Sequence, residues 1–507
     1  MCQVDEDYHN QLHQAEVPSV SKKCVKCKEA AAAVVIRAGD TYCRDCFKEY
    51  FIHKFRAMLG KNRVIFPGEK VMLAVSGGPS SCSMLSQVQE GLSQNAHKKL
   101  RFLPGIVFID EGGAVGQSVE ERERTLAELK AVFKATGFPY HMVPLEQVLD
   151  LPSSVVVTGP SPSERPASAY KEAVDHFIES NCRSCLTPLE PEETSLADFQ
   201  SHTQLLQQLI GSAKTLTARE DMLNTLRQHL LVHTARTKGY SKLMLGDNCT
   251  RLAVKLLANI SLGRGAQLAQ DTGFADSRYG DIVLVRPMRD YSAKEITYYN
   301  RIFNVPSVLI PSLDSKTTEK SSIQHLTESF VTKLQADFPS TVSTIYRTSE
   351  KLQTACKSSS TADPCDRCLL CMCTLDIAVE SASAFNATLI SEQLSQTNLS
   401  GATSASIPKQ LPASHWEAST GPCCSSGGGE NCGKTASVGG CCLPAKVPET
   451  SDLRSLLCYS CQLTVKDMLT VEILPQYILS EAQRRQRRSQ MKEEISEFLL
   501  DDADEGD

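Results

Sequence analysis

The chain has 507 residues, with 53 lysines and arginines against 59 aspartates and glutamates, for a net charge of −6. This length leaves room for roughly two to four domains, and the negative balance confines any nucleic-acid-binding surface to a local patch. The acidic first residues contain no apolar core of a signal peptide, and no apolar stretch is long enough to cross a bilayer. The sequence predicts an intracellular protein without membrane contact.

Many of the 21 cysteines occur as C-x-x-C pairs, which in a reducing compartment more often hold a metal or do redox chemistry than form disulfides. Cys24/Cys27 and Cys43/Cys46 lie on either side of an alternating stretch and a Gly-Asp turn typical of a hairpin. Four thiolates at this spacing predict a structural zinc ribbon. The alternative is two reduced dithiols, but so short a segment hardly folds without a metal ion or another cross-link.

A second group of cysteines brackets a long polar stretch. Cys365/Cys368 precede it and Cys458/Cys461 follow it, and its middle, about Ser381–Ser451, is too rich in Ser, Gly, Thr, Ala and Pro to form a core. If that middle is disordered, the two pairs can close a second zinc site, because loop-closure entropy grows only logarithmically with length. The rival ligands are Cys371, Cys373, Cys423, Cys424, Cys432, Cys441 and Cys442.

From Val71 onward, apolar segments of strand length alternate with amphipathic segments of helix length. This alternation predicts an α/β fold with a doubly wound parallel sheet covered on both faces. The expected strands are Val71–Val75, Phe102–Ile109, Tyr140–Val143, Lys242–Leu245 and Ile282–Val285, and the expected helices are Cys82–Gln94, Ser118–Thr136, Ala169–Ser180, Ala218–Thr237, Thr250–Leu262, Ala293–Arg301, Ile323–Phe338 and Val342–Leu352.

The turn after the first expected strand is Ser-Gly-Gly-Pro-Ser-Ser, followed by a helix start. Glycines let a phosphate approach the backbone, and the first turn of a helix offers unpaired N–H groups; the alternative is an ordinary strand-to-helix connection. Ligands of such sheets bind at the carboxyl ends of the strands, where one acidic segment and a Gly-Asp-Asn turn also follow strands. The candidate nucleotide-binding residues are Ser76, Gly77, Gly78, Ser80, Ser81, Asp110, Glu111 and Gly246, with Asp247 beside them.

Two expected helices carry runs of basic residues. Each run is either a solvated helix face or a contact for RNA, and an acidic tail follows the second. The residues are Lys48, His53, Lys54 and Arg56 in a helix over Phe47–Leu59, and Arg484, Arg485, Arg487 and Arg488 near the C-terminus.

The ordered set of a zinc ribbon, an S-G-G loop, an I-D-E-G segment after the second strand and a second cysteine module resembles the two-thiouridine synthetases of the N-type ATP pyrophosphatase class. Within that class the chain looks most like the second-subunit family of the cytosolic tRNA 2-thiolation complex, over about residues 20–475 without the Ser/Gly-rich insertion. The resemblance implies a PP-loop core, an adenine nucleotide alpha-hydrolase-like fold, flanked by zinc modules in a cytoplasmic protein.

An active member of the class adenylates the C2 oxygen of wobble uridine 34 in the tRNAs for Lys, Glu and Gln. Sulfur from the thiocarboxylated C-terminus of a ubiquitin-related modifier then replaces that oxygen, on the way to 5-methoxycarbonylmethyl-2-thiouridine. The resemblance implies that tRNA and the modifier are partners of the complex.

Three positions depart from the active pattern. Ser80 stands where active members have an aspartate, and a hydroxyl is a poor substitute for a carboxylate at a Mg²⁺ site. Thr250 and Arg251 replace an acidic pair, and Val285 replaces a third cysteine. The resemblance therefore implies a non-catalytic subunit without catalytic residues, with structural zinc and with ATP and Mg²⁺ binding in doubt, which forms a heterodimer with the catalytic paralogue and helps bind tRNA.

Alternatives stay open. The chain is alternatively a self-sufficient ATP-dependent RNA-modifying enzyme, or a zinc-ribbon adaptor. Cys182 and Cys185 match the C-x-x-C of active members, and form a vestigial or shared cluster site, a zinc site or plain thiols.

The expected domains follow the chain in order. They are a flexible N-terminus (1–20), a zinc ribbon with linker helix (21–60), the PP-loop core (61–355, with an insertion near 187–216), a cysteine module (356–380 plus 452–475), the Ser/Gly-rich insertion (381–451) and a charged helix with acidic tail (476–507).

Overall fold

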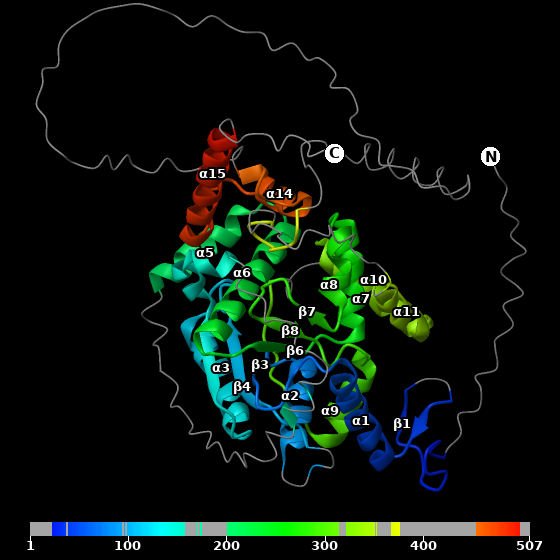
Figure 1. Ribbon diagram of the computed structural model, residues 1–507. Coiled ribbons are helices and arrows are strands. Elements are labelled where there is room, and N and C mark those ends of the chain that lie inside the picture. The colour runs from blue at the N-terminus through cyan, green and yellow to red at the C-terminus, as the bar shows by residue number, and fades with distance from the viewer. Residues whose placement is uncertain are drawn as a thin grey trace, which may run out of the picture. The chain divides into compact units, whose positions relative to one another are not determined.

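The computed structural model in Figure 1 describes residues 23–36, 39–93, 96, 99–157, 170, 173–174, 200–313, 321–349, 351, 367–375 and 453–496. All of these belong to one compact unit. Within these ranges, every helix is either too short or too polar to span a bilayer. The predictions for Cys182, Cys185, Cys365, the 381–451 insertion and most of the helix Ala169–Ser180 lie outside the described residues.

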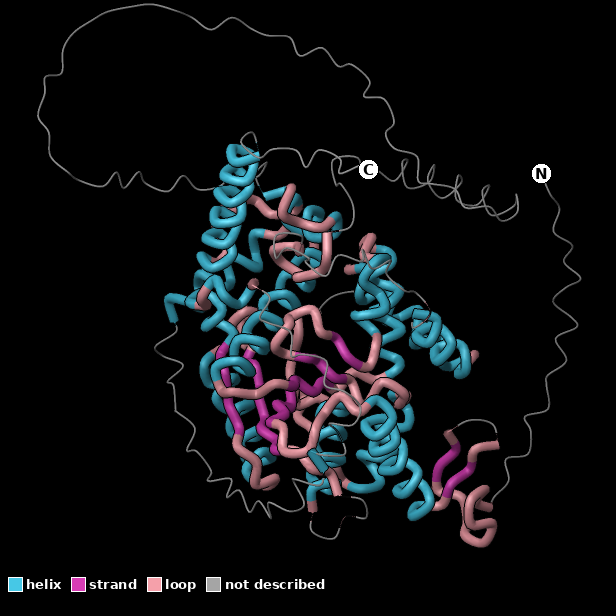
Figure 2. Tube along the Cα trace, in the orientation of Figure 1, coloured by secondary structure: helices cyan, strands magenta, loops and turns pink. Residues whose placement is uncertain are grey.

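A six-stranded sheet with the order β5-β4-β3-β6-β8-β7 forms the centre of this unit (Figure 2). The first five strands in that order are parallel, and each lies within one residue of its predicted bounds. Successive strands are added on one side of β3 up to β5 and on its other side from β6 onward. This makes a doubly wound sheet, with a crevice between β3 and β6 where the order switches. The strands are β3 (Lys70–Ala74), β4 (Leu103–Asp110), β5 (Tyr140–Pro144), β6 (Lys242–Leu245), β8 (Val283–Val285) and β7 (Ala275–Asp276).

The sixth strand, β7, was not predicted. It pairs antiparallel with β8, with Asp276 opposite Leu284. Two residues are too few to show the period of a strand, so its position depends on the tertiary structure.

Side chains of the sheet alternate between two apolar cores. Val71 and Leu73 pack into one core, and Met72 between them packs into the other, as expected for a sheet buried on both faces. The first core contains residues of α1 (Arg44–Asn62), α2 (Pro79–Leu92), α3 (Val119–Lys134) and α9 (Ala293–Phe303); the second contains residues of α5 (Gln200–Ser212), α6 (Leu216–Thr237), α14 (Tyr459–Lys466), α15 (Gln476–Ser496) and the 3₁₀ helices η2 (Leu145–Asp150) and η3 (Ser153–Val156).

A third, smaller core joins three helices. Leu252 on one helix packs with Val331 and Tyr346 on the other two. The helices are α7 (Cys249–Ser261), α10 (Ile323–Asp337) and α11 (Pro339–Ser349), and the short elements η5 (Gly265–Gln267) and α8 (Leu268–Thr272) follow α7.

Local sequence fixes where several of these helices begin. Ser118 and Glu121 form a capping box at the start of α3, and Ser292 and Glu295 form another at the start of α9. Such caps satisfy backbone N–H groups that the helix itself leaves unpaired, and stabilise it by about 1 kcal/mol each.

Candidate functional site

The loop after β3 is covered by a later segment of the chain. Gly77 has a positive φ of 78° and a Cβ at this position would lie 3.0 Å from Ile310 Cδ1, so only glycine fits without strain. The backbone N–H of Val308 donates a 2.9 Å hydrogen bond to Gly77 O. The predicted loop therefore exists, but one of its carbonyl groups is already bonded and apolar side chains pack against it.

The loop also meets the turn after β6, as the sequence predicted. A Cβ on Gly246 would lie 2.8 Å from Ser81 Cα, so the glycine permits the start of α2 to approach the turn. The side-chain N–H of Asn248 donates a 2.7 Å hydrogen bond to Ser80 Oγ. The Ser80 hydroxyl thus takes part in packing between two loops.

Asp110, at the end of β4, belongs to a buried ion-pair network. Arg122 Nε donates to Asp110 at 2.8 Å, and the two terminal nitrogens of Arg122 donate to Glu146 at 2.7 and 3.1 Å. The Glu146 side chain is fully buried, and Thr203 also donates to it. Burial lowers the pKa of Arg122, but the two carboxylates outweigh this and raise it. Asp110 is therefore anchored within the protein.

The other two predicted carboxylates also contact arginines. Glu111 accepts hydrogen bonds from Nε and a terminal nitrogen of Arg227, the second at 2.8 Å. Asp247 lies 3.4 Å from Nε of Arg286, whose side chain is 1% exposed. Each acidic side chain among the candidate nucleotide-binding residues thus faces a guanidinium group, which competes with a divalent cation for the carboxylate.

The three arginines were not predicted as part of the site. They lie 12, 116 and 39 residues from the carboxylates that they contact. No spacing rule connects positions so far apart, and only the fold brings them together.

The first cysteine group is assembled as predicted. The Sγ atoms of Cys24, Cys27, Cys43 and Cys46 all lie within 4.8 Å of one another. The antiparallel strands β1 (Val34–Val35) and β2 (Thr41–Tyr42) separate the two pairs. The arrangement differs from two equal knuckles, because Cys43 is the N-cap of α1 and Cys46 lies in its first turn.

The second cysteine group contains Cys368, Cys371, Cys458 and Cys461, whose Sγ atoms also lie within 4.8 Å of one another. The predicted set had Cys365, which lies outside the described residues; the structure gathers the rival Cys371 with the other three. The geometric reason is a tight turn in which the Met372 N–H donates to Cys368 O at 3.1 Å and brings both thiols of the pair together.

The two groups share one local architecture. A residue with positive φ follows the first pair in both, Lys28 in one and Met372 in the other. The second pair begins a helix in both, with Cys43 as N-cap of α1 and Cys458 as N-cap of α14. The positive end of a helix dipole stabilises thiolates, which are the form that binds a metal.

The distances within both groups fit a metal ion. Four thiolates at about 2.3 Å from one tetrahedral ion lie about 3.8 Å apart, compared with 4.0 Å for Cys27–Cys43 and 3.6 Å for Cys371–Cys458. Burial raises the pKa of Cys24, but backbone N–H groups of Cys27 and Cys43 outweigh it and lower the pKa to about 6. Either group can hold one metal ion.

Two of the four basic residues predicted for the face of α1 form ion pairs within the protein. Lys54 pairs with the buried Glu295 at 2.8 Å, and its ammonium group lies 4.6 Å from the centre of the Tyr291 ring. Lys48 lies 3.4 Å from Glu90. The Lys54 contacts fasten α1 to the core, so neither the solvated nor the RNA-binding interpretation describes Lys54, whereas the Lys48 side chain is 44% exposed and fits a solvated face.

Comparison with known proteins gives a consistent result. A family profile described as cytoplasmic tRNA 2-thiolation protein 2 matches residues 322–463. The protein of that description from Danio rerio is 56% identical over 515 residues, which cover 99% of each chain. The protein of that description from Homo sapiens is 49% identical over 528 residues, which cover 100% of this chain and 99% of that protein.

Among solved structures, the U34-tRNA thiolase NcsA from Methanococcus maripaludis with its 4Fe-4S cluster aligns with a TM-score of 0.44 and 15% identity. The alignment covers 66% of this chain and 87% of that chain. At this level the similarity supports no statement about the site.

Proposed function

Because the chain belongs to the cytoplasmic tRNA 2-thiolation protein 2 family, we propose that it acts in the cytoplasm in the 2-thiolation of tRNA, as a non-catalytic subunit. Its reaction partner is a catalytic paralogue, with which it forms a heterodimer. The complex thiolates wobble uridine 34 in the tRNAs for Lys, Glu and Gln, and takes sulfur from a thiocarboxylated ubiquitin-related modifier. This chain contributes an interface and a tRNA-binding surface.

The ion-paired carboxylates at the crevice between β3 and β6 support the non-catalytic part of the proposal. Adenylation of a uridine oxygen needs a metal ion to neutralise the charge that develops on the phosphates. The carboxylates of Asp110, Glu111 and Asp247 are each paired with an arginine, and Ser80 replaces the remaining one. These residues do not fit Mg²⁺, so the chemical step is assigned to the paralogue.

We further propose that zinc occupies both cysteine groups and has a structural role. Sγ atoms within 4.8 Å of one another surround a single ion, whereas a cubane of four irons would hold its thiolates farther apart. Zinc in the first group would hold the start of α1, and zinc in the second would hold the start of α14.

The deciding experiment measures ATP-dependent pyrophosphate release and tRNA thiolation by the purified chain, alone and mixed with the catalytic paralogue. The expected result is no turnover alone and thiolation in the mixture. Turnover by the chain alone would refute the non-catalytic assignment, and thiolation by the paralogue alone at the full rate would refute the role as a required subunit.

A matched variant sharpens the result. Replacing Ser80 by alanine removes the hydroxyl that accepts from Asn248, but leaves the backbone of the loop in place. The mixture should thiolate at an unchanged rate, because Ser80 contributes only to packing. A large loss of rate without a loss of binding to the paralogue would mean that this loop takes part in the chemistry.

A further inference from the structure

The two halves of the C-terminal helix α15 differ in burial. Tyr477, Ile478 and Ala482 are buried in the main core, at 2%, 0% and 0% exposure. Of the arginine run predicted from the sequence, Arg485 is also buried: it pairs with Glu481 at 2.8 Å and donates to Val156 O at 3.2 Å. Arg485 therefore anchors the helix and is unavailable to a ligand.

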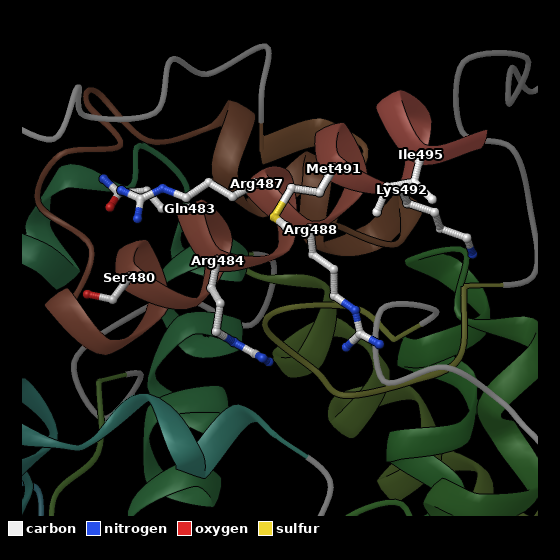
Figure 3. Close-up of a pocket in the computed structure, with 8 residues that line it drawn as sticks. All are labelled: Ser480, Gln483, Arg484, Arg487, Arg488, Met491, Lys492 and Ile495. Carbon is white, nitrogen blue, oxygen red and sulfur yellow. The ribbon is translucent and has the colours of Figure 1, made fainter. Parts of the chain in front are cut away.

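Beyond Arg485, α15 is basic and exposed, with Arg487, Arg488 and Lys492 all exposed. Figure 3 shows the guanidinium groups of Arg484 and Arg488 extending from the same side of the helix. At 100° per residue, Arg484, Arg488 and Lys492 form one row of a basic face that turns by about 40° at each step, and Glu493 points away from it. The residues that form the face and line an open pocket along it include Arg484, Arg487, Arg488, Met491, Lys492 and Ile495.

The face is held rigidly beside the second cysteine group. Tyr477 Oη lies 2.7 Å from Nδ1 of His229, and Nε2 of the same imidazole lies 2.8 Å from Leu370 O, between Cys368 and Cys371. Arg485 also donates to the carbonyl of Arg367, directly before Cys368. A presented face that is already ordered loses less entropy when it binds a ligand.

We propose that this face of α15 binds the phosphate backbone of an RNA. Arg488 and Lys492 follow one another at an interval of roughly 6 Å along the helix axis, comparable with the spacing of successive phosphates on a strand, and Arg487 adds a third cation beside them. Guanidinium groups match phosphate oxygens in a bidentate geometry. In a chain with a net charge of −6, such a face is a local attraction for a polyanion.

A membrane surface fits less well than RNA. A helix that lies on a membrane needs a broad apolar face, and the apolar side of α15 is buried in the protein, which leaves Met491 and Ile495 exposed on this face. The carboxylates of an acidic protein match the same guanidinium groups as phosphates do, so the charges alone do not choose between that partner and RNA. The choice of RNA rests on the proposed function, since the family acts in tRNA thiolation.

The test compares tRNA binding by the full-length chain with that of the triple variant R487Q/R488Q/K492Q across salt concentrations. Arg484 is left unchanged because it contacts Glu481, which holds the helix in place. The variant should bind roughly 100-fold more weakly near 0.15 M salt, and the slope of log affinity against log salt should fall by about three. The charge-matched control R124Q/K134Q/K238Q alters exposed residues of α3 and the end of α6, and should bind as the unmodified chain does.

An unchanged affinity and slope in the triple variant would overturn the inference, as would an equal loss in the control. Loss of binding to phosphatidylserine vesicles or polyglutamate with tRNA affinity retained would reassign the face to that ligand. Thiolation by the variant with the catalytic paralogue separates the two proposals. If the unmodified chain supports thiolation and the triple variant binds tRNA with unchanged affinity, the inference about α15 fails and the proposed function stands. If the unmodified chain does not support thiolation, the premise itself fails.

Discussion

Replacing Arg122 by alanine should destabilise the protein by about 3–5 kcal/mol, because it leaves two buried carboxylates without their cation. The side chains of Arg122, Asp110 and Glu146 are 3%, 9% and 0% exposed, so water replaces the lost contacts poorly. The remaining donors are neutral: the Gly112 N–H donates to Asp110, and the Thr203 hydroxyl donates to Glu146. These hydrogen bonds offset only part of the loss.

The assay is urea unfolding followed by far-UV circular dichroism, with the free energy of unfolding extrapolated to water. Arg124 lies on the same helix and is exposed, so R124A is the matched control and should change stability by less than about 0.5 kcal/mol. The triple variant R122M/D110N/E146Q removes all three charges and should recover part of the loss, since no unpaired charge remains.

Two results would refute this reasoning. A change below about 1 kcal/mol in R122A would mean that the carboxylates are solvated and free to bind a cation. A triple variant less stable than R122A would mean that the charges themselves, and not their pairing, stabilise this end of the sheet.

Three other predictions follow from the structure. C371S should lose one of two bound metal ions in a metal assay of the purified protein, and C365S should keep both; the reverse would return Cys365 to the set of ligands. Burial lowers the pKa of His229 to about 4, below its value of about 6.5 in the unfolded chain. Stability is therefore lost as pH falls from 6.5 towards 4, by about 2 kcal/mol at pH 5, and H229N should unfold with a flatter dependence over this window. G246A should cost about 1–3 kcal/mol, because the new methyl group meets the Ser81 backbone; a neutral effect would argue that the two loops move apart freely.

The sheet could be predicted because its strands are short apolar runs bounded by turns. Val71–Val75 and Lys242–Leu245 show this pattern, and parallel strands buried on both faces leave little else for such runs to form. The strand Ala275–Asp276 could not be predicted, because its pairing with β8 comes from the fold and not from a local period.

The sequence predicted that there are two cysteine groups, but it did not predict every cysteine that belongs to them. Cys368 is part of two overlapping C-x-x-C pairs, with Cys365 before it and Cys371 after it, and spacing alone does not choose between them. The choice depends on backbone geometry: Met372 adopts a positive φ of 59° directly after Cys371, as Lys28 does after Cys27. The partners of the acidic residues were beyond prediction, since they are distant in sequence.

The acidic side chains at the crevice between β3 and β6 are neutralised by arginines of the same chain. An active site leaves its carboxylates uncompensated until a cation binds, which costs free energy in the empty state; here Arg122, Arg227 and Arg286 supply that compensation permanently. The cysteine groups extend this logic, because each begins a helix that packs on the main fold: Phe51 of α1 stacks on Tyr299 at 4.0 Å between ring centroids, and α14 packs in the other core. These paired charges and helix-starting thiols fit the proposed non-catalytic subunit, which needs a fixed surface for partners and no ATP turnover.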